Sequence, residues 1–193
     1  MKKLFIFVFI TFMSSQSLSA NDIKEFEIEG MSIGHSLLKY MSKSQIETSK
    51  FPIIMAGKKL YEYQKVSSNV KSDNYDSVLL YFKNGDPEKI IVAISGRKFY
   101  KNNFDECYKL QNTIVSELET IFPNERKVDH GKEKIDSFPD GNSYMKLISF
   151  FLNDGSAQVG CYDFSKTDTN SRDRLSVAIF SKQYEKWYHS IGD

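Results

Sequence analysis

The sequence predicts an α+β protein built on one antiparallel sheet, with helices on one face and two halves that each hold a helix and three strands. Two observations predict this architecture. Six segments rich in apolar, β-branched and aromatic residues fall into two groups of three, and each group follows a segment with helical spacing. Hairpin-length links join strands within a group, and such links require antiparallel neighbours.

The N-terminal segment differs in composition from the rest of the chain. Two lysines precede an apolar run at residues 4–13, and a small, polar stretch follows up to Ala20. The run is about half the roughly 20 residues that a membrane-spanning helix needs. We therefore interpret 1–20 as a signal peptide cleaved after Ala20 or Ser19, and 21–193 as a single α+β domain. This predicts a periplasmic or secreted protein with no membrane anchor in its mature form.

The first half begins with FEIEG, which alternates apolar and charged residues and predicts a short strand or extended lead-in. Residues 32–50 have apolar side chains at helical spacing, and Ser42 with Gln45 can form a capping box, so we expect one kinked helix or two short ones. The three strand segments that follow are LYEYQKV, YDSVLLYFK and KIIVAISGRKFY. The linker NGDPE between the last two has turn chemistry.

The second half begins with the clearest helix, residues 103–122. Asn103 can cap it and Pro123 ends it. Residues 124–142 are mostly polar and predict a long loop. Three strands follow, in YMKLISFFL, GSAQVGCYDF and RLSVAIFS, and the aromatic residues of KQYEKWYHSIGD predict a short terminal helix packed on the sheet.

Charge and cysteine content exclude some functions. The chain has 26 basic residues, and subtracting the 2 signal lysines leaves 24 against 25 acidic residues, so no electrostatic argument favours nucleic acid or an anionic membrane. Cys107 and Cys161 are the two cysteines, and in an oxidising compartment they predict one disulfide. Closing a loop of about 55 residues would stabilise the fold by about 4 kcal/mol. A reactive thiol is the alternative, but neither cysteine has a basic neighbour that would lower its pKa.

The stretch EGMSIGHSLL at residues 29–38 contains two strings found in hydrolases. GMSIG matches the GxSxG pattern, with Ser32 as the nucleophile, but it comes too early in the chain for the strands that precede a nucleophile elbow. We interpret Ser32 as the N-cap of a helix. GHSL resembles the motif of the GDSL esterases, which implies Ser36 as the nucleophile, with His35 in the place of the aspartate. That family's Asp-x-x-His block is missing.

A serine hydrolase remains the alternative, because distant residues can assemble a triad. Its base would be His130, with Asp129 beside it, acting on Ser36 or Ser32. No histidine pair has the spacing of a metal site, and nothing resembles a phosphate-binding loop, so we expect no metal and no cofactor.

Tyrosines recur in the expected strands and predict a binding surface on the open face of the sheet. The candidates are Tyr61, Tyr63, Tyr81, Tyr144 and Tyr162. Aromatic side chains with a polar end are good anchors for a partner. Tyrosine also has a high strand propensity of its own, so the same pattern can be purely structural.

Two longer stretches, FEIEGMSIGHSLLKYMSKSQI and ECYKLQNTIVSEL, resemble an uncharacterised family of small exported proteins from AT-rich marine bacteria, in which the first stretch reads EGMSIGDSLL. The resemblance covers about a third of the chain and implies no known activity. The Gly-Met-Ser lead into a helix and the repeated halves are similar to the fold of the tandem-repeat β-lactamase inhibitor protein and of the barrel-assembly lipoprotein. The chain lacks a lipid-bearing cysteine near residue 20.

Together these features predict an exported, non-enzymatic binding or interaction module. Its partner would be a protein or small ligand of the cell envelope. The alternatives are the small periplasmic hydrolase and a small-ligand carrier, which would need an enclosed apolar cavity of a few hundred Å³ beneath the sheet.

Overall fold

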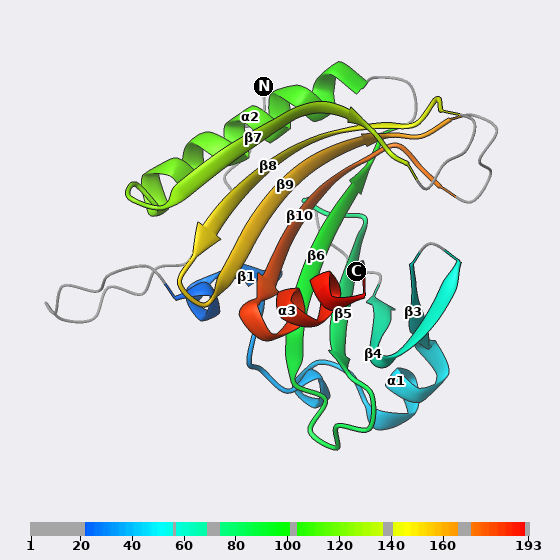
Figure 1. Cartoon of the computed structure of the whole chain (residues 1–193). Coiled ribbons are helices and arrows are strands. Elements are labelled where there is room, and N and C mark those ends of the chain that lie inside the picture. The colour runs from blue at the N-terminus through cyan, green and yellow to red at the C-terminus, as the bar shows by residue number, and fades with distance from the viewer. Residues whose placement is uncertain are drawn as a thin grey trace, which may run out of the picture.

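An eight-stranded antiparallel sheet forms the centre of the computed structural model, which describes residues 22–55, 57–68, 74–100, 104–136, 141–165 and 171–191 (Figure 1). The predicted signal peptide therefore lies outside the described residues. The strands are β3 (Lys50–Met55), β4 (Lys58–Ser68), β5 (Ser77–Lys83), β6 (Ile91–Phe99), β7 (Arg126–Lys134), β8 (Tyr144–Leu152), β9 (Gly155–Asp163) and β10 (Arg174–Ser181). The predicted α+β class and antiparallel sheet are confirmed.

The sheet has the strand order β3-β4-β5-β6-β10-β9-β8-β7, so the two halves meet where β6 pairs with β10. Each half contributes four strands rather than the three we predicted. The two extra strands, β3 and β7, form the opposite edges of the sheet (Figure 1). Strand β7 occupies part of the segment predicted to be a loop. An edge strand with largely exposed side chains lacks the apolar alternation from which strands are recognised.

The N-terminal region is more broken than predicted. It comprises η1 (Ile23–Glu25), β1 (Glu27–Ile28), β2 (Met31–Ser32), η2 (Leu37–Lys39) and α1 (Lys43–Ser49). A two-residue turn joins β1 to β2, and both of its residues have positive φ, 54° at Glu29 and 73° at Gly30, as a type I′ turn requires. Gly34, at φ 86°, then directs the chain to the sheet, where its N–H donates to the carbonyl of Ile91 at 2.9 Å.

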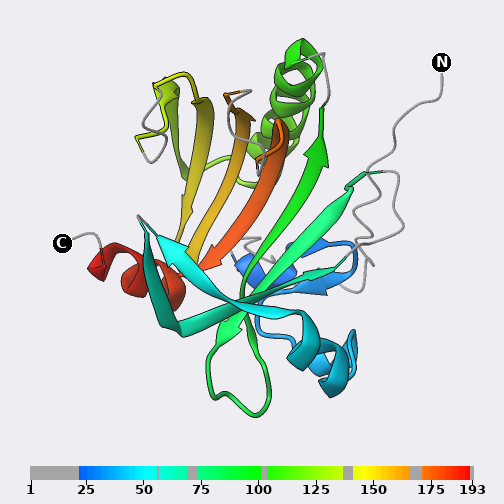
Figure 2. The same cartoon turned by 90° about the vertical axis from the view of Figure 1, so that its right-hand side faces the viewer.

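The helices α2 (Phe104–Ile121) and α3 (Lys182–Ser190) lie on opposite faces of the sheet, which corrects the prediction that helices cover one face (Figure 2). The reason is visible in β10, where alternate side chains point to opposite faces and both faces carry apolar residues toward the end of the strand. Val177 and Ile179 pack in the core cluster that contains the α2 residues, whereas Phe180 packs against Tyr184 of α3. We call these sides the α2 face and the α3 face.

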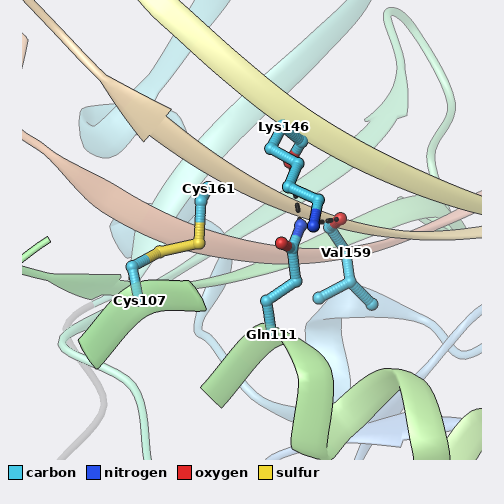
Figure 3. Close-up of a disulfide and its surroundings, with 5 residues drawn as sticks. All are labelled: Cys107, Gln111, Lys146, Val159 and Cys161. Carbon is cyan, nitrogen blue, oxygen red and sulfur yellow. Dashed lines mark hydrogen bonds between the residues drawn. A yellow bond between two sulfur atoms is a disulfide. The ribbon is translucent and has the colours of Figure 1, made fainter. Parts of the chain in front are cut away.

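The disulfide between Cys107 and Cys161 ties α2 to β9, as predicted (Figure 3). Its Cα atoms are 6.0 Å apart, and both side chains are buried in the core of the α2 face. One helical turn further on, the buried Gln111 amide donates to the carbonyls of Lys146 at 2.8 Å and Val159 at 2.9 Å. This amide therefore joins the helix to both β8 and β9. No helix in the described ranges is long and apolar enough to cross a membrane.

Candidate functional site

A cleft of about 310 Å³ opens on the α3 face. Its floor is formed by side chains of the central strands β5, β6, β10, β9 and β8, and its wall is α3. The cleft therefore spans the junction between the two halves of the sheet, where β6 pairs with β10. Polar, charged and aromatic side chains share its lining. It is not the enclosed apolar cavity that a carrier of an apolar ligand would need.

The floor of the cleft follows from the alternation of side chains along β6 and β10. Ser95 and Arg97 of β6 lie on the α3 face, as do Arg174 and Ser176 of β10. Arg97 and Ser176 are direct partners across the two strands, so Arg174 is the diagonal neighbour of Arg97. The hydroxyls of Ser95 and Ser176 are 2.8 Å apart and form a hydrogen bond across the same junction.

Positive charge gathers at this junction. Burial lowers the pKa of Arg174 to about 10, with repulsion from Arg97 as the second cause. Lys65, on β4 and separated from β6 by β5, also has a lowered pKa, first from burial and then from the charges of Arg97 and Arg174. Arg97 and Arg174 thus place two like charges on adjacent strands of the cleft floor, and Lys65, which pairs with Tyr81, lies on the same face of the sheet two strands away from Arg97.

The two arginines lack the partners that buried cations usually have. In both Arg97 and Arg174 the Nε atom is buried and has no hydrogen-bond partner, and the ion pairs of the described residues include neither side chain. Arg174 donates from Nη1 to the carbonyl of Arg172 at 3.5 Å. Its guanidinium carbon lies 5.0 Å from the ring centroid of Tyr162 and 4.6 Å from that of Phe164. Aromatic stacking therefore holds Arg174 in place without neutralising it.

The wall of the cleft is fixed by the start of α3. Ser181 caps this helix, and its hydroxyl accepts a hydrogen bond from the N–H of Tyr184 at 3.3 Å. The ring of Tyr184 stacks on Phe180, with centroids 5.8 Å apart. Glu185 is the acid among the described lining residues, and it accepts a hydrogen bond from the hydroxyl of Ser156 at 2.5 Å. Its carboxylate is thus bonded on the β9 side of the cleft, and no ion pair joins it to the arginines.

The structure gathers part of the predicted tyrosine surface. Tyr81 and Tyr162 line the cleft, and burial raises the pKa of each hydroxyl. Tyr63 is also on the α3 face, but it is buried, with its ring centroid 4.5 Å from that of Trp187. The other two lie elsewhere. Tyr61 is 58% exposed on β4, and Tyr144 is on the α2 face, because it alternates with the residues of β8 that point into the cleft.

The candidate nucleophiles have structural partners. Ser32 is fully buried in β2, not at a helix start, and its hydroxyl donates to the carbonyls of Lys24 at 2.5 Å and Phe26 at 3.3 Å. Ser36 caps η2 and donates to the carbonyl of Glu88 at 2.6 Å. Among the described residues, neither hydroxyl is hydrogen-bonded to a histidine. The neighbouring His35 has its Nδ1 2.6 Å from the hydroxyl of Tyr40.

The predicted base and acid are not brought to these serines. His130 and Asp129 lie on the edge strand β7. Ser36 forms a bridge with Ile90, which directly precedes β6. Three strands, β10, β9 and β8, lie between β6 and β7 in the sheet. His130 Nε2 lies 3.1 Å from the hydroxyl of the buried Ser149, and Asp129 instead accepts from the N–H of Gly131 at 2.8 Å. In the described part of the chain, no cluster of three or more His, Cys, Asp or Glu could hold a metal.

Sequence reasoning missed the arginine pair. A signal was present, because ISGRKF and RLSVAIF place serine and arginine at alternate positions of otherwise apolar strands. Such alternation predicts a strand with one polar face. The alternation does not reveal that the two polar faces lie side by side. Their adjacency depends on the pairing of β6 with β10, and these strands are about 80 residues apart in the sequence.

Comparisons with known proteins add little to this description. No protein-family model and no curated protein matches the chain. Among solved structures, a mutant of protein Mog1 matches with a TM-score of 0.29 and 9% sequence identity, over 75% of this chain and 84% of that one. A similarity this low carries no argument about fold or function. The resemblance to exported proteins with the EGMSIGDSLL stretch stays a prediction.

Proposed function

We propose that the protein is an exported, non-enzymatic binding module that holds a ligand in the cleft on the α3 face. The observation that carries the proposal is the group of buried, unpartnered polar atoms on Arg97 and Arg174 within a cleft lined by aromatic side chains. Buried polar groups are nearly always hydrogen-bonded, and exceptions often mark functional sites. Export to the periplasm or the exterior is supported by the composition of residues 1–20.

The size and lining of the cleft favour a small ligand of the cell envelope. A volume of about 310 Å³ lies at the lower end of the range for small-molecule sites. Aromatic surfaces beside a few polar groups are typical of such sites, because the apolar part supplies affinity and the polar groups supply orientation. Tyr81 and Tyr162 combine both properties in one side chain.

The hydrolase alternative receives no support from the geometry. A serine nucleophile needs a base within hydrogen-bond reach and an acid that orients the base. The hydroxyls of Ser32 and Ser36 are instead bonded to backbone carbonyls. Among the described residues, the serine hydroxyl that bonds to a histidine is that of Ser149, which is 1% exposed, and its partner His130 is not bonded to Asp129.

Filling the cleft tests the proposal. Ala178 lies on its floor, and Ala178→Trp would occupy the space above β10, whereas Ala178→Ser is a matched control that leaves the space open. We expect the wild type and Ala178→Ser to retain a small molecule from an envelope extract, seen as added mass in native mass spectrometry, and Ala178→Trp to retain none. Circular dichroism would verify that all three fold. Equal retention by a folded Ala178→Trp protein would contradict the proposal.

A further inference from the structure

We infer that the cleft recognises an oxyanion, a carboxylate or phosphate group, through Arg97 and Arg174. The inference rests on the proposed binding function and names the class of ligand.

The geometry concerns which atoms of the arginines lack partners. In both residues the atom without a hydrogen-bond partner is Nε. Together with one Nη, Nε forms a flat edge of the guanidinium group. Such an edge matches the two oxygens of a carboxylate or phosphate and binds them with two parallel hydrogen bonds. The side chains are diagonal neighbours on β6 and β10 and line the same cleft. One oxyanion can therefore accept hydrogen bonds from both.

The charge balance favours an anion over a neutral group. Arg97 and Arg174 are diagonal neighbours on the cleft floor, and the ion pairs of the described chain leave both of them, and Lys65 on the same face, without a carboxylate. The acid of the cleft, Glu185, is bonded to Ser156. Holding like charges together at a partly buried site costs free energy, which a bound anion would offset. A cationic ligand would add to the repulsion.

The surroundings indicate that the oxyanion belongs to a molecule with an apolar part. Tyr81, Tyr162 and Tyr188 line the cleft, together with Leu147 and Phe180. Since burial raises the pKa of all three tyrosine hydroxyls, they remain protonated and can donate hydrogen bonds at neutral pH. We therefore expect aromatic or aliphatic carboxylates or phosphates to bind better than inorganic phosphate.

A panel of simple probes tests this inference on the whole protein. The probes are benzoate, phenyl phosphate, inorganic phosphate, benzyl alcohol and benzylamine, used at up to millimolar concentrations. The only tryptophan, Trp187, packs on Tyr184 of the cleft wall, so its fluorescence reports binding, and calorimetry provides an independent measure. We expect benzoate or phenyl phosphate to bind at least about tenfold more tightly than benzyl alcohol, and benzylamine to bind most weakly. The comparison of benzoate with phenyl phosphate distinguishes a carboxylate from a phosphate.

Substituting each arginine tests whether Arg97 and Arg174 are the residues that bind the anion. Arg97→Gln and Arg174→Gln should each weaken the preferred anion by at least about tenfold and leave benzyl alcohol unaffected. Arg126→Gln is the matched control, because Arg126 is exposed on the edge strand β7 and its removal changes the net charge equally. If either glutamine variant fails to fold, Arg→Lys at the same position keeps the charge but removes the Nε edge and should still weaken binding.

The outcomes separate this inference from the proposed function. If benzyl alcohol binds as tightly as the anions, and Ala178→Trp abolishes its binding, the cleft is a binding site but the oxyanion inference is wrong. Anion binding that survives both arginine substitutions would also overturn the inference. Failure of every probe to bind would overturn it as well, whereas retention of an envelope ligand blocked by Ala178→Trp would still support the binding function.

Discussion

Replacing both Cys107 and Cys161 with alanine is expected to lower the free energy of unfolding by about 4 kcal/mol. The two cysteines are separated by 54 residues in the sequence, and the bond restricts the unfolded chain by closing that loop. For a domain of this size, each kcal/mol corresponds to about 2–4 °C in Tm, so the expected decrease is about 8–16 °C.

Urea denaturation followed by Trp187 fluorescence measures this change directly. The wild type in reductant should match the double alanine variant, and reductant should leave the variant unchanged. Reduction should also increase the m-value, because the unfolded chain without the bond exposes more surface. A decrease below about 1 kcal/mol would refute the loop-closure reasoning. Two free thiols in the denatured, unreduced protein would show that the bond does not form.

Further predictions concern single positions. Gln111→Leu should lower stability by about 1–3 kcal/mol in chemical denaturation, because its amide bonds to β8 and β9 are lost from a buried site. Gly30→Ala should lower the free energy of unfolding by about 1–2 kcal/mol in the same assay, because φ at Gly30 is 73° and alanine is strained there. A methyl group at this position would meet no other atom, so a larger loss would contradict this explanation. Ser36→Ala should lower the free energy of unfolding by about 1 kcal/mol, because the serine hydroxyl caps η2, and an unchanged stability would show that this cap is dispensable. Burial first, and then neighbouring tyrosines, raise the pKa of Tyr184 above the ordinary value of 10.0, so its contribution to stability is complete below about pH 10 and is lost as the pH rises further. Arg174 and Lys65, whose pKa values are lowered, act in the opposite direction, but the tyrosines with a raised pKa outnumber them. The unfolding free energy should therefore be lower at about pH 11 than at about pH 8, and a gain would contradict this balance.

Much of the fold follows from local patterns in the sequence. The helix predicted at 103–122 is observed as Phe104–Ile121, while its predicted cap Asn103 lies outside the described residues. The apolar stripe of this helix put Cys107 on its buried face, and the disulfide followed from the two cysteines and the expected compartment. These predictions succeeded because each depends on residues close together in the sequence or on a single possible pairing.

The features that escaped prediction depend on long-range pairing or on the turn geometry of glycines. Ser32 could not be recognised as a strand residue, because the type I′ turn at Glu29 and Gly30 overrides the helical spacing that follows. Tyr144 was grouped with Tyr162 without knowledge of the register that places them on opposite faces. The cleft itself requires β6 to lie beside β10, which no local pattern states.

The place of β10 in the sheet has a consequence for the order of folding. This strand is the last of the described strands in sequence order, yet it lies between β6 and β9 and joins the two halves. Until it is inserted, β6 and β9 each present an unpaired edge to other chains. The native pairing of β6 with β10 spans about 80 residues, so it forms slowly relative to the hairpins. A chain that ends before residue 174 would therefore retain two open edges and be prone to aggregation rather than forming a smaller native protein.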